Sequence, residues 1–167
     1  METQYDYAVF IGRFQPFHRG HYHVAIEALK KASKLIFVIG SHDAPRTPKN
    51  PFTTVERREI ILSAFDDEQR KRIKMIQQTD HTYNEERWIS SIQTSVLNTC
   101  LNDNEWSPDP IKIALVGYSK DHSSYYLKKF PQWDLIEIEP IYKNLSATCV
   151  RNVLLFDPKE LLDQYSY

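Results

Sequence analysis

The 167-residue sequence predicts an α/β fold, a doubly wound and mainly parallel five-stranded sheet with helices on both faces. Short apolar runs alternate along the chain with segments whose apolar residues recur at helical spacing, as in β-α-β units. Two runs, residues 34–40 and 111–117, are almost continuously apolar, as strands of a buried parallel sheet require. Because 41% of the residues are hydrophobic, one sizeable core can form, and we expect a single domain over residues 1–167.

The predicted elements follow in chain order. The strands are expected at residues 7–11, 34–40, 73–77, 111–117 and 133–139. The helices are expected at residues 19–33, 54–65 and 85–101, with a short helix over 123–130 and a last helix that opens within 145–151. Thr54 is expected to cap the second of these helices, and the charged residues 66–68 are expected to end it. A loop with three prolines, residues 41–53, follows the second strand, and loops of this length are often functional.

Glycine usage indicates where a ligand would bind. The sequence has four glycines, and Gly12, Gly40 and Gly117 end predicted strands, whereas Gly20 lies in the loop after the first strand. Parallel sheets bind ligands outside the carboxyl ends of their strands, where permissive backbone is useful. We therefore expect the site at this edge of the sheet.

The most informative stretch is the loop between the first strand and the first helix, residues 11–21, which reads IGRFQPFHRGH. It contains three cationic or potentially cationic groups, Arg13, His18 and His21, and the histidines can share a face of the first helical turn. Gly20 leaves the start of the helix open, where free N–H groups favour anions. The loop therefore predicts a site for a phosphate whose charge grows during a reaction.

The two histidines allow a second interpretation, a metal site. A His-x-x-His pair can be half of a metal site, but no further ligand cluster is nearby, since Cys100 and Cys149 lie far away. The two cysteines have no disulfide or metal-ligand spacing and indicate a reducing compartment, so we expect a cytoplasmic protein. A net charge of −1 gives no general attraction to nucleic acids or membranes, and no signal-like or bilayer-length apolar segment is evident.

The loop also resembles a known signature. Residues 12–21, GRFQPFHRGH, are similar to the motif of the nucleotidyltransferases that carry His-x-Gly-His. The Gly-Arg-Phe-Gln-Pro form resembles the archaeal-type nicotinamide-nucleotide adenylyltransferases, which also occur as the N-terminal domain of bifunctional adenylyltransferase/Nudix proteins. This resemblance implies a Rossmann-like fold and in-line transfer between ATP and nicotinamide mononucleotide, giving NAD and pyrophosphate. It also implies Mg²⁺ held mainly by ATP, with no protein metal ligand.

Two later segments resemble the nucleotide-binding parts of that family. Residues 146–151, Ser-x-Thr-x-x-Arg, look like its second signature, and residues 116–121, Val-Gly-x-x-Lys-Asp, look like the loop whose lysine faces phosphates. Ser146 is also a good helix cap, which is its ordinary structural interpretation. The resemblance implies the catalytic residues His18, His21, Arg13 and Arg151. It implies an ATP site of Ile11, Gly12, Arg13, Phe14, His18, His21, Gly117, Lys120, Asp121, Ser146, Thr148 and Arg151.

The mononucleotide site is assigned in the same way. Residues 50–57, Asn-Pro-Phe-Thr-x-x-Glu-Arg, and the spacing of Asp80 to Trp88 resemble segments that bind the nicotinamide nucleotide, with the indole stacked on the ring. On periodicity alone, Trp88 would be a core residue and Arg57 part of a solvated face. The implied site is Phe14, Gly40, Asn50, Phe52, Thr53, Arg57, Asp80 and Trp88.

Two alternatives stay open. One is a related transferase that acts on pantetheine phosphate or uses CTP, although residues 50–53 and the Asp80 and Trp88 pair favour the nicotinamide substrate. The other is a nucleotide-sensing module without catalysis, although the joint presence of His18, His21 and Arg151 favours an enzyme. The expected partners are ATP, nicotinamide mononucleotide and NAD, with no nucleic acid or membrane, and a homo-oligomer is expected. The chain has no room for a Nudix domain before residue 167.

Overall fold

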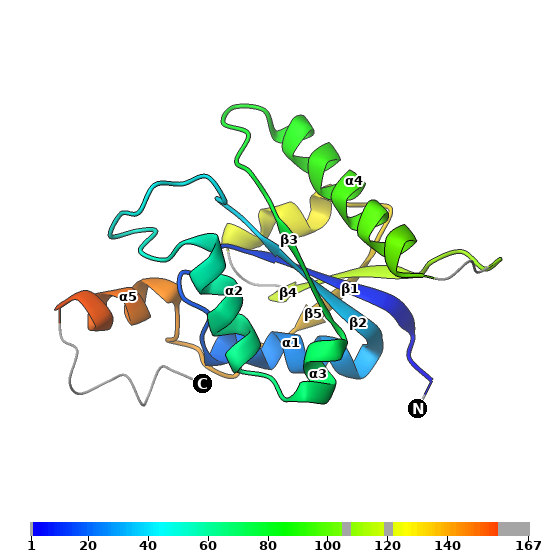
Figure 1. Ribbon diagram of the computed structural model, residues 1–167, viewed down its shortest axis with the longest axis horizontal. Helices are drawn as coiled ribbons and strands as arrows, with labels where there is room; N and C mark the ends of the chain where they lie inside the picture. The colour runs from blue at the N-terminus through cyan, green and yellow to red at the C-terminus, as the bar shows by residue number, and fades with distance from the viewer. Residues whose placement is uncertain (1, 105–107, 119–121, 157–167) are drawn as a thin grey trace.

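The computed structural model describes residues 2–104, 108–118 and 122–156. Its sheet has five strands, β1 (Tyr5–Gly12), β2 (Ala32–Ile39), β3 (Ile73–Gln77), β4 (Ile113–Tyr118) and β5 (Asp134–Ile138). Their order is β3-β2-β1-β4-β5, and every pair of neighbours is parallel (Figure 1). The predicted sheet is therefore confirmed, and it is parallel throughout.

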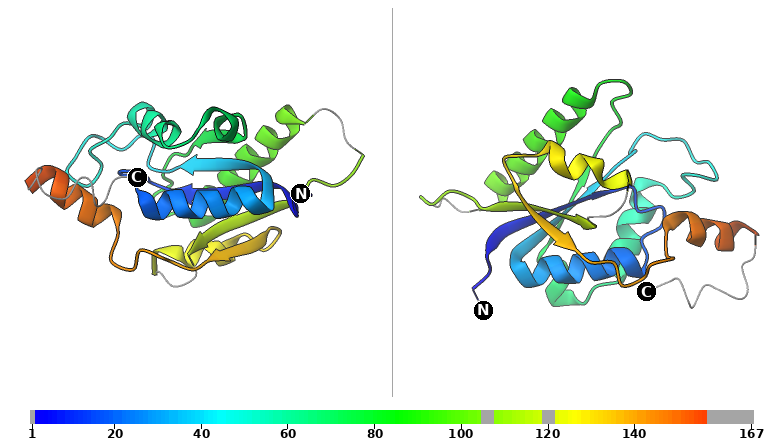
Figure 2. Two further views of the ribbon diagram at one scale, coloured as in Figure 1. Left: turned by 90° about the horizontal axis from the view of Figure 1, so that it is seen from below. Right: turned by 180° about the vertical axis from the view of Figure 1, so that it is seen from behind.

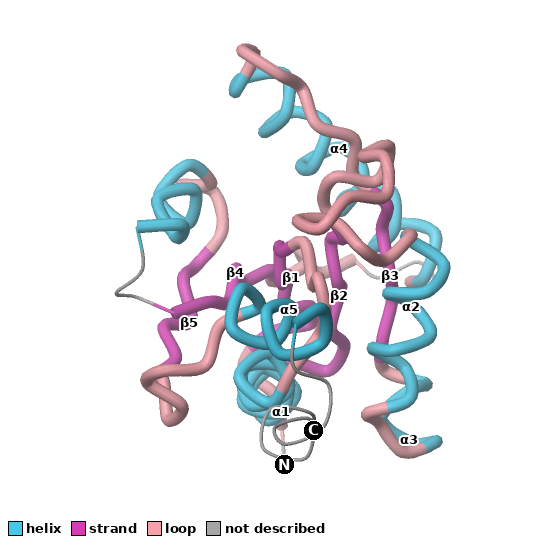
Figure 3. Tube along the Cα trace, turned by 90° about the vertical axis from the view of Figure 1, so that its left-hand side faces the viewer, coloured by secondary structure: helices cyan, strands magenta, loops and turns pink. Residues whose placement is uncertain are grey.

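Helices cover both faces of this sheet. They are α1 (Arg19–Lys31), α2 (Thr54–Ser63), α3 (Asp67–Lys71), α4 (Glu85–Asp103), the 3-10 helix η1 (His122–Lys129) and α5 (Ala147–Phe156). In Figure 3, α1 and α4 lie on opposite sides of the strands. Alternate side chains of β1 supply the two cores: Ala8 and Phe10 pack with α1 and α2, and Val9 and Ile11 with α4 and η1. The prediction of a doubly wound, Rossmann-like fold is confirmed.

Three details of the secondary structure differ from the sequence prediction. Thr53, and not Thr54, caps α2, because its hydroxyl accepts from the Glu56 N–H while Glu56 accepts from the Thr53 N–H. Residues 66–68 do not simply end this helix, since Asp66 caps the separate helix α3. The short helix before Pro131 is a 3-10 helix. None of the described helices combines the length and hydrophobicity that crossing a bilayer requires.

An ion-pair network joins α4 to the sheet at the amino ends of the strands. Asp103, in the last turn of α4, accepts a hydrogen bond of 2.8 Å from the Tyr7 hydroxyl. Its carboxylate oxygens lie 2.5 Å from Lys34 Nζ and 2.6 Å from Lys74 Nζ. These three partners stand on β1, β2 and β3, so one carboxylate connects the helix to three strands.

The carboxyl ends of the strands face the opposite way, toward the end of the molecule where α5 lies (Figure 2). The chain leaves β1 for β2 and β3 on one side, and later adds β4 and β5 on the other. The junction of β1 and β4 is therefore the point at which the strand order reverses, and such points form ligand-binding crevices.

Candidate active site

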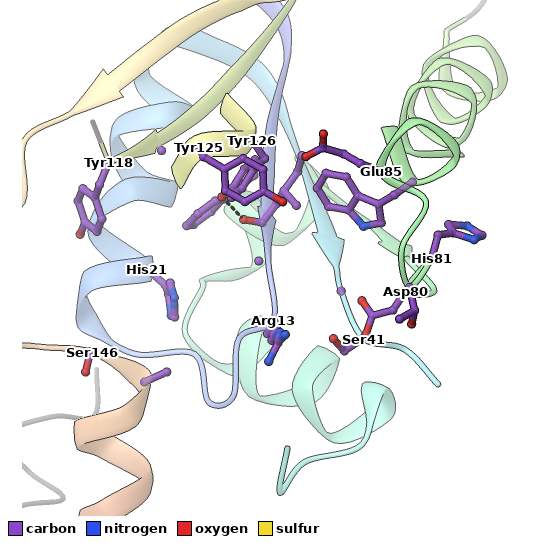
Figure 4. A pocket seen from close by; sticks show the side chains of 18 of the residues that line it. Arg13, His21, Ser41, Asp80, His81, Glu85, Tyr118, Tyr125, Tyr126 and Ser146 are labelled. Carbon is purple, nitrogen blue, oxygen red and sulfur yellow. Dashed lines mark hydrogen bonds between the residues drawn. The ribbon is translucent and has the colours of Figure 1, made fainter. Parts of the chain in front are cut away.

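A cavity of about 1020 Å³ opens at this reversal point, a size that suits small-molecule ligands. Figure 4 shows Arg13 between His21 on one side and Asp80 on the other. We call the two sides the histidine end (His18, His21, Tyr118 and Ser146) and the Asp80 end (Asp80, Glu85 and Trp88). The predicted residues that line the cavity are Ile11, Gly12, Arg13, His18, His21, Gly40, Asp80, Trp88, Gly117 and Ser146.

The two histidines form the cap of α1. His18 is the N-cap, and its Nδ1 accepts from the Gly20 N–H at 3.1 Å, while His21 Nδ1 accepts from the His18 N–H at 3.3 Å. The rings are stacked with their centroids 3.8 Å apart. Because each Nδ1 is an acceptor, each neutral imidazole carries its proton on Nε2. The backbone of one helical turn thus fixes both tautomers.

Gly20 is needed here for space. A Cβ atom at Gly20 would lie 2.9 Å from His18 Cε1 and 3.1 Å from His18 Nδ1, closer than such atoms pack. None of the described glycines has a positive φ. At Gly12 the added atom would meet the Phe14 ring at 2.9 Å. Both glycines therefore let side chains of the loop lie against the backbone.

The histidines are neutral, although the sequence suggested potential cations. Burial lowers the pKa of His18 to about 4. Burial also lowers the pKa of His21 well below its ordinary value, and the nearby His18 lowers it further. Aromatic side chains surround His21, since Phe14 and Phe17 have ring centroids 5.0 and 5.6 Å from it. The pair thus presents neutral donors, and Arg13 is the one arginine or lysine among the described residues that line the cavity.

We expect neither histidine to titrate in the free protein at pH values from about 5.5 to 8, because an unperturbed imidazole titrates near 6.5. Nitrogen-15 NMR of the ring atoms should show the Nε2–H tautomer for both residues. The unfolded chain binds protons at these residues below about pH 6.5 and the folded chain does not, so stability should fall as the pH drops from about 6.5 toward 4. Titration of either ring near pH 6.5 would contradict this account.

Arg151 connects α5 to the histidine loop. Its Nη1 donates to the Gln15 carbonyl at 3.0 Å and its Nη2 to the Thr148 hydroxyl at 3.1 Å. Burial lowers the pKa of Arg151, and repulsion from Arg13 lowers it further. Neither Thr148 nor Arg151 lines the cavity, but Ser146 and Ala147, at the start of the same helix, do. The structure therefore brings residues 13, 18 and 21 into one cavity, with residue 151 bound to the loop behind them.

The Asp80 end combines aromatic and acidic side chains. Trp88 is half-buried and packs edge-on against Tyr126 and Phe130, with ring centroids 6.1 and 6.2 Å apart. It thus belongs to the core, as its periodicity indicates, and also lines the cavity. Asp80 follows β3 and is exposed, and Glu85 forms an ion pair of 3.3 Å with Lys129.

The other residues assigned to the mononucleotide support the loops around the cavity. Phe14 is 2% exposed and lies in the core. The Phe52 backbone forms two hydrogen bonds with the Gln15 side chain, of 2.8 and 3.0 Å, and Thr53 caps α2. Asn50 Oδ1 is buried without a hydrogen-bond partner among the described residues. Arg57 is buried and bonds to backbone carbonyls. Their roles in substrate binding stay predictions.

Two of the assigned residues, Lys120 and Asp121, lie outside the described residues. The sequence prediction also omitted several residues that line the cavity. Among the missed residues, Tyr118 donates to the Gly20 carbonyl at 2.7 Å, and Tyr126 to the Ile11 carbonyl at 2.9 Å. Ser41 and Tyr118 stand at strand ends, a signal that the sequence does contain. Tyr126 has no such signal, because only tertiary packing brings η1 to the cavity.

The fold and this site define a Rossmann-like nucleotide-binding protein in which residues 12–21 carry two histidines that line the cavity. The cytidylyltransferase-like family matches residues 9–153, and the chain belongs to this family.

Named relatives refine this assignment. A nicotinamide/nicotinic acid mononucleotide adenylyltransferase of Acinetobacter baylyi is 37% identical over 148 residues, which are 89% of this chain and 74% of the relative. A nicotinamide-nucleotide adenylyltransferase of Pyrococcus furiosus is 36% identical over 91 residues, 53% of this chain and 48% of the relative. The resemblance to the archaeal-type enzymes is thus confirmed.

A solved structure is also similar. It is a bifunctional NMN adenylyltransferase/ADP-ribose pyrophosphatase of Francisella tularensis, complexed with AMP and a manganese ion. The sequence identity is 36% and the TM-score is 0.73. The match covers 89% of this chain and 41% of the bifunctional chain.

Proposed function

We propose that the chain is a nicotinamide-nucleotide adenylyltransferase, which joins ATP and nicotinamide mononucleotide to form NAD and pyrophosphate in NAD biosynthesis. The observation that carries this proposal is one cavity in which Arg13 lies between the neutral histidines on one side and the Asp80 end on the other. A nucleotide polyphosphate suits the histidine end, and a flat nitrogen-containing ring suits the indole. The named relatives support the same substrates.

The reaction needs orientation and charge stabilisation more than covalent chemistry. An oxygen of the mononucleotide 5′-phosphate, which is ionised at neutral pH, forms a bond to the α-phosphorus of ATP while the bond to pyrophosphate breaks. The Nε2–H groups of His18 and His21 donate hydrogen bonds to the phosphate oxygens, and Arg13 neutralises their charge. Because each Nδ1 accepts a hydrogen bond within the cap of α1, the Nε2–H group is the donor that each neutral imidazole offers.

A divalent cation would bind at this site together with the substrate. The described residues contain no group of three or more His, Cys, Asp or Glu side chains that could hold a metal ion. We therefore propose that Mg²⁺ is bound through ATP oxygens and water, where it would neutralise polyphosphate charge. The homo-oligomeric state and the cytoplasmic location stay predictions.

We further propose that the nicotinamide form is preferred over the nicotinic acid form. The pyridinium ring of the mononucleotide is cationic, and the acid form adds a carboxylate to it. Asp80 attracts the cationic ring and repels that carboxylate, whereas the charge of Glu85 is offset by Lys129.

The test is incubation of purified protein with ATP, Mg²⁺ and each mononucleotide, followed by chromatographic detection of NAD or its acid analogue. We expect NAD, with kcat/KM for the amide at least about fivefold above that for the acid, the effect of about 1 kcal/mol from one partly solvated charge. Asp80→Asn should reduce this ratio, and Glu86→Gln, on the exposed side of α4, should not. Equal ratios in the wild type and Asp80→Asn would refute the role of Asp80. Absence of product with either mononucleotide would refute the proposed function.

A further inference from the structure

Arg57 is a buried cation whose hydrogen-bond partners are neutral groups, while the charges of Arg13 and Asp80 act on it from further away. Its side chain on α2 belongs to a residue that is 1% exposed, and it is not among the residues that line the cavity. Within the described parts of the chain it forms no ion pair with a carboxylate. Burying a charge is costly unless hydrogen bonds compensate for it. A side chain with this burial leaves its guanidinium no surface with which to bind a substrate.

Three hydrogen bonds of this guanidinium reach the two loops that follow β1 and β2, and two others stay at the start of α2, where Nε donates to the Thr53 carbonyl at 3.3 Å. Nη1 donates to the carbonyls of Arg13 and Gly40, both at 2.7 Å. Nη2 donates to the Ser41 carbonyl at 3.4 Å and to the Thr54 hydroxyl at 3.0 Å. Arg13 directly follows β1, and Gly40 and Ser41 directly follow β2. The guanidinium group of Arg57 therefore connects the carboxyl ends of the neighbouring strands β1 and β2 by hydrogen bonds.

These carbonyls flank the strained parts of the loops. Phe14 has φ 54° and Ser41 has φ 51°, left-handed values that favour glycine, and each such residue costs about 1 kcal/mol or more. The Arg13 carbonyl belongs to the peptide unit before Phe14, and the Gly40 carbonyl to the unit before Ser41. Since φ sets the orientation of the preceding peptide unit, the bonds from Arg57 stabilise both left-handed turns.

We infer that Arg57 is a positioning residue, which acts on the reaction through Arg13 and Ser41 by fixing the peptide units at the ends of β1 and β2. Arg13 and Ser41 both line the cavity, so a change in these turns moves their side chains relative to bound phosphate. Lysine cannot replace this arginine, because an ammonium group lacks the planar fork that reaches several carbonyls at once. The kinetic test of this inference rests on the proposed function. In this inference Arg57 does not contact the substrate and affects the reaction indirectly.

The test is a double-mutant cycle of Arg57→Lys and Arg13→Ala. Arg57→Lys alone should lower kcat/KM by about 10²-fold, the scale of a misplacement of about 1 Å. In the Arg13→Ala background the same substitution should lower kcat/KM by no more than about fivefold, because its effect acts mainly through Arg13. Equal losses in both backgrounds, or a lowered Tm with unchanged kcat/KM in Arg57→Lys alone, would overturn the inference.

A matched control distinguishes positioning from stability. Arg72 also donates to three backbone carbonyls, those of Leu29, Ala32 and Ser33, at 2.6, 2.8 and 2.8 Å, but it lies before β3 at the other end of the sheet. Arg72→Lys should lower Tm without lowering kcat/KM. A comparable loss of kcat/KM in Arg72→Lys would show that general destabilisation explains the effect and would overturn the inference.

Two further measurements keep the inference testable if Arg57→Lys does not fold or the wild type forms no NAD. Thr54→Val removes one acceptor of Arg57 and should lower kcat/KM by about three- to tenfold, as loss of one hydrogen bond of about 1 kcal/mol predicts. Thr54→Ser should preserve the activity, and equal activity of the two variants would contradict the role of Arg57.

If the wild type forms no NAD, the proposed function fails, and the same double-mutant cycle of Arg57→Lys and Arg13→Ala is measured on the Kd for ATP by calorimetry. Additive effects on that Kd would then overturn the inference by itself.

Discussion

His21→Ala should lower kcat by about 10²-fold or more, with a smaller change in the Kd for ATP. The reason is that a neutral Nε2–H donor at the histidine end stabilises charge that grows on the phosphate oxygens as the new bond forms. Steady-state kinetics with ATP and nicotinamide mononucleotide, together with calorimetric ATP binding, measure the two effects separately. An unchanged kcat would remove His21 from the mechanism.

The controls for His21 must account for its structural role. His21 Nδ1 accepts from the His18 N–H in the cap of α1, so alanine also removes a capping contact, a loss of about 1 kcal/mol in stability. Glutamine at this helical position can restore such a cap. His21→Gln should therefore keep most of the Tm and still lose kcat. His23→Ala, two residues further along α1 and outside the cavity lining, should keep both.

Asp103→Asn should destabilise the fold by about 2 kcal/mol and lower Tm by about 4–8 °C. The carboxylate of Asp103 is 13% exposed and joins two lysines and the Tyr7 hydroxyl. Removing its charge leaves Lys34 and Lys74 without this partner. Both lysines are about one-third exposed, at 33% and 36%, which keeps the effect below that of a fully buried pair. Urea unfolding of both proteins at neutral pH measures the difference.

The same substitution has a defined pH dependence. Burial alone would raise the pKa of Asp103, but hydrogen bonds from Lys34, Lys74 and Tyr7 outweigh burial and lower the pKa below its ordinary value. The folded chain therefore releases this proton more readily than the unfolded chain, and the network contributes fully only above about pH 4. The difference between wild type and Asp103→Asn should shrink as the pH falls from about 7 to 3. Asp134→Asn, which alters an exposed hydrogen bond with Tyr5, should change stability by less than about 0.5 kcal/mol. A constant difference at all pH values would contradict the ion-pair explanation.

The buried strands and the place of the histidine-containing loop, residues 12–21, at the cavity were predictable from the sequence because their signals are local. Continuous apolar runs identify β2 and β4, since parallel strands are covered on both faces. The loop from Gly12 to His21 combines glycine, arginine and histidine within a few residues, and its place after β1 puts it at the carboxyl edge of any such sheet. These features also identified the family. By contrast, the sequence offers both Thr53 and Thr54 as the cap of α2. The tertiary structure decides between them, because the Thr54 hydroxyl accepts a hydrogen bond from Arg57 and Thr53 caps the helix.

The tertiary structure decided the protonation state of the histidines and the hydrogen-bond partners of Arg57. The histidines are neutral because burial disfavours their charged form, with Phe14 and Phe17 packed against His21, and no spacing of residues encodes that burial. Arg57, whose sequence context indicates a substrate contact, donates hydrogen bonds to carbonyls that precede it by 16 to 44 positions in the chain. The sequence by itself determined the strand and helix pattern and the chemistry of the loop. Burial, and the contacts between distant segments that create it, determined which of these groups carry charge and which of them reach the cavity.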